Sequence, residues 1–181
     1  MKVLGIDPGL TRPGFFYDDT AYSLNLSGLS EWDAYAELAE FYSGMLGKLT
    51  AREAEGLLIC CENPVLPKFG IGVKTLLAQG AIRCITKQLS LARIFVPVYW
   101  VDVPPTSLKK FATGFGNAHK SQVFYAAREA GALVATEDEA DAYWCWRIGQ
   151  MYGNYAEVPD TVPEGYEFPE WTTVMPEVVT I

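Results

Sequence analysis

Two apolar runs of strand length, well separated along the chain, each end in a single carboxylate. Residues 2–7 alternate in the manner of a β-strand and stop at Pro8-Gly9, so that Asp7 closes the run. Residues 56–61 form a second apolar run, and Glu62 follows it directly. In open sheets with helical crossovers, ligands collect outside the carboxyl ends of the strands. If these two strands are parallel neighbours, Asp7 and Glu62 stand side by side at one edge of a sheet.

The pattern of apolar residues and turn signals predicts one domain over residues 1–152 and an acidic, extended C-terminal tail over residues 153–181. Within the domain, segments with strand periodicity precede and separate segments with helical periodicity, which predicts an α/β fold with a mixed five-stranded sheet flanked by helices. The expected strands span residues 2–7, 14–17, 21–26, 56–61 and 95–101. The expected helices span residues 30–49, 73–94, 106–112, 120–130 and 137–152.

Composition narrows the class of protein. Half of the residues are apolar and 20% are charged, the balance of a globular domain. The apolar runs are too short to cross a bilayer, and the first residues lead directly into the Asp7 strand rather than into a signal peptide. We therefore expect a cytoplasmic protein that does not associate with membranes.

The formal net charge of −8 is unevenly distributed. Nine Lys and Arg residues but one acid, Asp102, lie between positions 63 and 128, whereas residues 157–181 carry six acids and no base. A basic middle segment favours a polyanionic partner such as nucleic acid. The same side chains can equally well solvate helix faces, and charge alone leaves both interpretations open.

The second half of the chain adds a lysine and two more carboxylates. A glycine-containing turn leads into Lys120 at the start of one helix, and Asp138 and Asp141 open the next, where their spacing places both on one face. Four clustered acids need compensating positive charge, because like charges raise one another's pKa. Oxygen ligands without nearby His or Cys favour magnesium or manganese. Two such ions stabilise the attacking and leaving oxygens of an in-line phosphoryl displacement.

Each acid also has a purely structural interpretation. Asp7-Pro8-Gly9 can be a turn, Glu62 a solvent-facing strand end, and Asp138 an acid that favours the positive end of its helix. Asp141 is harder to explain in this way, because the residues around it are apolar. A zinc site is disfavoured, since His119 is the single histidine and no C-x-x-C spacing occurs.

Taken together, the motifs resemble the RuvC family of Holliday-junction resolvases over about residues 1–150. They are G-I-D-P-G at 5–9, G-x-G-x-A-x-K-S-Q-V at 114–123 and D-x-A-D-A at 138–142, with a glutamate that ends a central strand. The resemblance implies an RNase H-like fold, a homodimer, and metal-dependent, paired nicking of four-way or otherwise branched DNA. Two Mg²⁺ ions are implied for each active site, with Mn²⁺ as a substitute. The residues that match the family's metal-binding acids and its basic residue near the cleavage site are Asp7, Glu62, Asp138, Asp141 and Lys120.

Further residues are expected to contact DNA. In this family the loop after the catalytic glutamate carries a phenylalanine that wedges into the junction centre; Val65 takes that position here, and Phe69 is the candidate wedge. The other expected DNA contacts are Lys68, Lys74, Lys109, Lys110 and Lys120. Such departures, together with the acidic tail, suggest a phage-type member.

The long helix at 73–94 is the candidate dimer interface, because small and apolar residues form one stripe along it. An ordinary core helix is the alternative.

Two other functions stay open at this point. One is an RNA-acting nuclease of the same fold, as in the related YqgF family. The other is a catalytically silent DNA-binding or assembly module, which the intact set of four acids disfavours.

Overall fold

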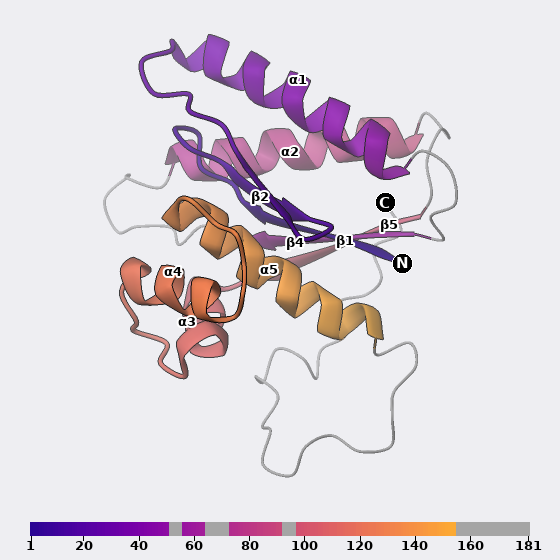
Figure 1. The fold of residues 1–181 in the computed structure, drawn as a ribbon. Helices are drawn as coiled ribbons and strands as arrows, with labels where there is room; N and C mark the ends of the chain where they lie inside the picture. The colour runs from indigo at the N-terminus through magenta and orange to yellow at the C-terminus, as the bar shows by residue number, and fades with distance from the viewer. Residues whose placement is uncertain (51–55, 64–72, 92–96, 155–181) are drawn as a thin grey trace.

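The computed structural model describes residues 1–50, 56–63, 73–91 and 97–154 (Figure 1). A mixed five-stranded sheet with helices on both faces confirms the predicted fold class. Among these residues, no helix combines the length and hydropathy needed to cross a membrane. In chain order the elements are β1 (Lys2–Asp7), β2 (Gly14–Tyr17), β3 (Thr20–Ser23), α1 (Glu31–Thr50), β4 (Leu57–Glu62), α2 (Val73–Leu91), β5 (Val98–Val103), α3 (Pro105–Thr113), α4 (Lys120–Glu129) and α5 (Glu137–Asn154).

The sheet has the strand order β3-β2-β1-β4-β5. β1, β4 and β5 run parallel, and β2 and β3 extend the sheet antiparallel from β1. The hairpin between β2 and β3 turns at Asp18 and Asp19, whose φ values of 50° and 57° suit a tight two-residue turn. Because Ile6 pairs with Cys61, the next residues along the two parallel strands, Asp7 and Glu62, stand level at the same edge of the sheet.

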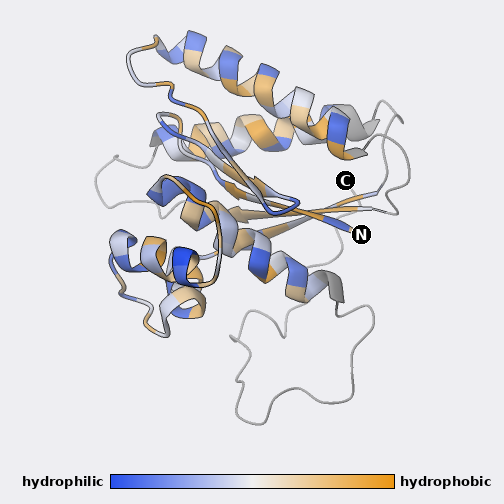
Figure 2. Cartoon of the chain, in the orientation of Figure 1, coloured by the Kyte–Doolittle hydropathy of each residue, from blue (hydrophilic) through white to orange (hydrophobic). Residues whose placement is uncertain are grey.

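Two hydrophobic layers sandwich the sheet. α1 and α2 cover one face around Leu38, Tyr42 and Ile82, while α5, with α3 and α4 beside it, covers the other around Val123 and Cys145 (Figure 1). The central strands β1 and β4 are mainly hydrophobic, whereas the helices mix hydrophobic and hydrophilic residues (Figure 2). That distribution is expected for a sheet buried on both faces and helices buried on one.

Most predicted elements are present, and the differences lie at their ends. The prediction for β5 was wrong at its carboxyl end, since the strand continues to Val103, which is buried and pairs with Glu62. β3 ends at Ser23 rather than at residue 26, and α5 extends to Asn154. Part of the predicted 95–101 strand and the end of the predicted 73–94 helix lie outside the described residues, as does the tail from residue 155 onward.

Two glycines determine how closely α5 approaches the sheet. A methyl group on Gly5 of β1 would lie 2.0 Å from the carbonyl oxygen of Ala142, and one on Gly14 of β2 would lie 2.2 Å from that of Asp138. Neither distance is possible for a real Cβ atom, so any larger residue would push the helix away. Because these two positions lack side chains, α5, which carries Asp138 and Asp141, can pack directly against the backbone of the sheet.

Candidate active site

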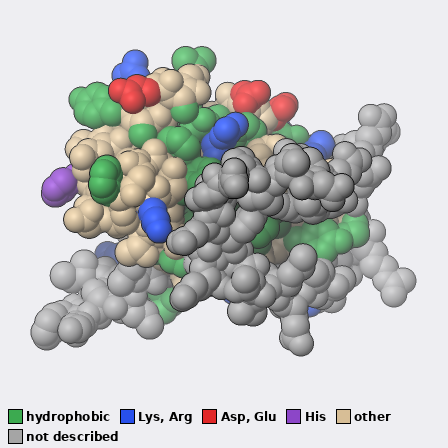
Figure 3. Space-filling model, turned by 90° about the horizontal axis from the view of Figure 1, so that it is seen from below, with side chains coloured by type: hydrophobic (Ala, Val, Ile, Leu, Met, Phe, Trp, Pro, Cys, Tyr) green, Lys and Arg blue, Asp and Glu red, His purple; other side chains and the backbone are tan. Residues whose placement is uncertain are grey.

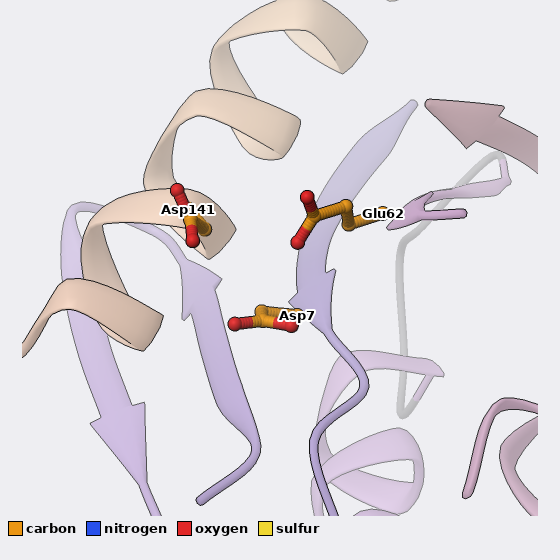
Figure 4. A group of neighbouring side chains, drawn as sticks. All are labelled: Asp7, Glu62 and Asp141. Atoms are coloured by element: carbon orange, nitrogen blue, oxygen red, sulfur yellow. The ribbon is translucent and has the colours of Figure 1, made fainter. Parts of the chain in front are cut away.

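The structure brings together three acids that are far apart in the sequence. Asp7 ends β1, Glu62 ends β4, and Asp141 lies on α5 above them, with the three side chains pointing toward one another (Figure 4). Each offers a carboxylate oxygen, and these three oxygens all lie within 4.8 Å of one another. This arrangement follows from the parallel pairing of β1 and β4 and from the close packing of α5 against the sheet.

Burial makes this cluster electrostatically costly. Asp7 and Asp141 are 7% and 3% exposed. Burial, followed by the charge of Glu62, raises the pKa of Asp7 well above its ordinary value. Burial and the charge of Asp141 raise the pKa of Glu62 to about 7. Burial likewise raises the pKa of Asp141, against the opposing charge of Lys120. The site therefore carries excess negative potential that a cation would relieve.

Lys120, the first residue of α4, supplies part of that positive charge. Its Nζ atom lies 3.2 Å from Asp138, 3.2 Å from Asp141 and 3.9 Å from Asp7. Partial burial lowers the pKa of the lysine, but the surrounding carboxylates outweigh this effect and leave its pKa raised. Asp138, which is not one of the three converging acids, is linked to them through this ammonium.

The local sequence explains why Lys120 reaches the acids. Gly114 closes α3 with a φ of 82°, a left-handed conformation that favours glycine, and turns the chain back toward α4. The Gln122 side chain accepts a hydrogen bond of 2.9 Å from the His119 backbone N–H, which closes the first turn of α4. Trp144 of α5 donates a hydrogen bond of 3.1 Å to the Val123 carbonyl, so the lysine helix is tied to the acid helix.

Lys109 is a functional candidate that sequence reasoning placed only among the DNA contacts. Its charge lowers the pKa values of both Glu62 and Asp141, so it stands near the acid cluster. The sequence carries no signal for this proximity, because it depends on how α3 packs beside α4 and α5. Lys74 and Lys110 are exposed, at the start of α2 and on α3. Lys68 and Phe69 lie outside the described residues.

The lower face of the molecule shows no single basic patch over its described part. Lys and Arg side chains are dispersed there among hydrophobic ones (Figure 3). Lys109 and Lys120, whose charges lower the pKa values of Glu62 and Asp141, come from the adjacent helices α3 and α4.

A mixed sheet of this topology, with acids at the ends of two adjacent parallel strands and a helix packed over them, is an RNase H-like fold. Comparison with known proteins agrees with this fold. The chain is 30% identical over 155 residues to "Crossover junction endodeoxyribonuclease RuvC" of Synechococcus sp. (strain CC9902), which covers 78% of this chain and 93% of the relative. The same enzyme of Parasynechococcus marenigrum (strain WH8102) gives the same identity and coverage. The chain belongs to the RuvC family.

Solved structures support the same fold. Thermus thermophilus RuvC superimposes with a TM-score of 0.60 at 20% identity and covers 86% of this chain and 97% of its own. T. thermophilus RuvC in complex with a Holliday junction substrate gives a TM-score of 0.61 at 21% identity, with 86% and 96% coverage. A scan against models of protein families gives no match.

Proposed function

We propose that this chain is a structure-selective DNA endonuclease that resolves Holliday junctions by paired, metal-dependent hydrolysis of phosphodiester bonds. The convergence of Asp7, Glu62 and Asp141 beside Lys120 is the observation that carries the proposal. The curated relatives are named crossover junction endodeoxyribonucleases, and the similar T. thermophilus structure holds a Holliday junction substrate. The protein would act on DNA in the cytoplasm of a bacterial or phage-infected cell, in association with the nucleoid.

The residues of the cluster fit a hard divalent cation. All the candidate ligands are carboxylates. Oxygens of Asp7, Glu62 and Asp141 lie within 4.8 Å of one another, and burial raises the pKa of each of these three acids. We assign the site to two Mg²⁺ ions, with Mn²⁺ as a substitute, because both metals favour oxygen ligands. When bound, such ions neutralise the charge that develops on the attacking and leaving oxygens of a phosphoryl displacement.

The chain's own residues would divide the remaining work. Asp7, Glu62 and Asp141 would hold the ions, with Asp7 serving both, and Asp138 in the first turn of α5 would complete the set. Lys120 would donate to a phosphate oxygen and stabilise its developing charge. Contacts to the DNA backbone, which position a substrate without reading its sequence, are assigned to Lys68, Phe69, Lys74, Lys109, Lys110 and Lys120.

A homodimer is part of the proposal, since two coordinated cuts in a junction of two-fold symmetry need two sites. The α2 stripe remains the candidate interface. Leu76 and Leu77 are 42% and 47% exposed, and Leu77 lines a hollow together with Trp32 of α1, which is 84% exposed. Large exposed apolar side chains beside a concave surface favour a protein contact. Sedimentation of a monomer at micromolar concentration, with and without junction DNA, would exclude the dimer.

The decisive experiment uses a synthetic four-way junction incubated with the protein, with and without Mg²⁺. Paired, symmetric nicks that depend on the metal and disappear in excess chelator are expected. Structured RNA, tested under the same conditions, should stay intact; preferential cleavage of RNA would indicate a nuclease with a different substrate. Binding without cleavage at any metal concentration would indicate a silent DNA-binding module and refute the proposal.

A further inference from the structure

Glu139, between the two acids of α5, makes a set of contacts that the proposed mechanism does not use. The side chain is buried, although it is a carboxylate. One carboxylate oxygen accepts a hydrogen bond of 2.6 Å from the Ser23 hydroxyl at the end of β3, and the other accepts one of 2.6 Å from the backbone N–H of Ala135. Its own backbone N–H donates to Thr136 Oγ1 at 3.1 Å. The first turn of α5 is thus hydrogen-bonded both to the segment that precedes it and to the β2–β3 hairpin.

These contacts lie on the same row of the sheet as the acid cluster. Asp7 of β1 pairs with Gly14 of β2, and Gly14 pairs with Ser23 of β3. The row therefore runs from Asp7 across Gly14 to Ser23. Above it, the backbone of Asp138 packs against Gly14, where no side chain intervenes, and Glu139 reaches Ser23.

We infer that Glu139, through Ser23 and Ala135, is a positioning residue that holds the first turn of α5 at the distance from β1 required for the metal centre. The contact with Gly14 limits how near the helix can come, but a contact of this kind does not prevent the helix from moving away or turning about its axis. Two hydrogen bonds to one buried carboxylate, one from the β2–β3 hairpin and one from the segment that precedes α5, resist both motions. Since Asp138 directly precedes Glu139 and Asp141 follows within the same turn, a rotation of this turn would move both acids relative to Asp7.

A carboxylate suits this role because it is an acceptor only. Ser23 and Ala135 each present a donor, so both oxygens are used and no donor of Glu139 is left unpaired. A glutamine could accept from Ala135 through its carbonyl and donate its amide to the Ser23 hydroxyl, which can also accept, but these neutral bonds would be weaker than the charge-assisted ones of the carboxylate. Glu139→Gln is therefore expected to lose part of the effect, and Glu139→Ala all of it.

The test measures metal binding apart from catalysis. This inference rests on the proposed function, so wild-type protein is first titrated with Mn²⁺ and followed by electron paramagnetic resonance. Ser23→Ala and Glu139→Ala are then expected to bind Mn²⁺ about 10-fold more weakly or worse, the usual effect of losing a residue that orients a metal ligand. Both should also raise the Mg²⁺ concentration for half-maximal cleavage, while affinity for junction DNA stays unchanged. Ser23→Ala removes a single hydroxyl from an exposed residue and keeps the test valid if Glu139→Ala does not fold.

Tyr42→Phe is the matched control. The Tyr42 hydroxyl forms a buried hydrogen bond of 2.7 Å with Thr86, in the α1–α2 layer on the other face of the sheet. Its loss should lower Tm without affecting Mn²⁺ binding. If Ser23→Ala and Glu139→Ala behave in the same way, with lower Tm and unchanged Mn²⁺ affinity, Glu139 only braces the fold and the inference is wrong. A wild-type protein that binds no Mn²⁺ would overturn the proposed function itself.

Discussion

The Lys120 ammonium lies 3.2 Å from a carboxylate oxygen of Asp141, an acid that is 3% exposed. The same ammonium is equally close to Asp138 and slightly farther from Asp7. One lysine therefore offsets part of the charge of acids from both β1 and α5. The lysine and a divalent cation would both neutralise these carboxylates. Substitutions of the lysine and of the acids should therefore affect metal binding and cleavage in different ways.

Asp7→Asn should abolish cleavage and leave junction binding intact. The substitution removes a ligand charge from the centre of the cluster but none of the lysines assigned to DNA. Loss of residues that merely support metal ligands costs about 10–100-fold, so removal of a ligand should lower the cleavage rate by more than about 100-fold. Gel-shift and cleavage assays on one four-way junction measure both quantities. Equal losses in binding and cleavage would contradict the separation of roles.

Lys120→Met should slow cleavage without weakening metal binding. Loss of a donor to developing charge typically costs about 100- to 1000-fold in rate. The lysine pairs with the same oxygens that a cation would use, so Mn²⁺ affinity in the variant should be unchanged or higher. Single-turnover cleavage and Mn²⁺ titration test the two parts. A marked fall in Mn²⁺ affinity would show that the lysine supports the metal site rather than competing for it.

Metal binding should strengthen as pH rises through about 7. Burial and Asp141 raise the pKa of Glu62 to about 7, so protons compete with a cation below this pH. In the absence of metal, the folded protein binds more protons than the unfolded chain between the ordinary pKa of Glu62, 4.5, and about 7. Folding stability should therefore fall as pH rises across that window.

Thermal unfolding in chelator and Mg²⁺ titrations at several pH values measure the two effects. Glu62→Gln serves as the control, since it should flatten the stability profile over the window. A Mg²⁺ requirement that does not vary between pH 6 and pH 8 would contradict the raised pKa.

Gly14→Ala should destabilise the protein and weaken its metal centre together. The added methyl group would lie 2.2 Å from the carbonyl oxygen of Asp138 and so would displace the first turn of α5. Overpacking of this kind costs about 1–3 kcal/mol of unfolding free energy. Gly44→Ala on α1 is the control, because nothing lies within 4 Å of its methyl position, and it should be neutral or slightly stabilising. Denaturant unfolding and Mn²⁺ titration of both variants provide the comparison; unchanged metal affinity in Gly14→Ala would refute it.

Deletion of residues 157–181 should tighten junction binding at low salt. The segment carries six acids and no base, so it can compete with DNA phosphates for the lysines of the site. Screening weakens that competition, and the gain in affinity should therefore shrink as ionic strength rises. Binding isotherms over a salt series measure the effect. A truncated protein that melts earlier and binds no better would instead identify the tail as a packing element.

The fold and the strand-end acids were predictable because they follow from local patterns. An alternating segment predicts β1 and a continuous apolar run predicts β4. A single acid at the end of each predicts where Asp7 and Glu62 meet once the strands are parallel neighbours. The helical spacing of Asp138 and Asp141 likewise predicts a shared face.

What the sequence did not reveal depends on contacts between distant elements. The effect of the Lys109 charge on the pKa values of Glu62 and Asp141 depends on the packing of α3, and the buried Glu139 finds its partner in Ser23, which is 116 residues away in the chain. Asp102, the one acid of the basic middle segment, pairs with Arg83 and accepts hydrogen bonds from Gln79 at 3.1 Å and Trp100 at 3.0 Å. No spacing of residues in the sequence predicts any of these contacts.

The position of α5 in the chain has a consequence for protein synthesis. β1 supplies Asp7 early, but Asp138 and Asp141 arrive only with α5, which follows every other helix and strand that the structure describes. A chain still being translated therefore lacks two of its four candidate ligands until α5 has left the ribosome. If these acids hold the metal as proposed, the metal centre would be completed only after the rest of the domain has been made, and an unfinished chain would not cleave DNA.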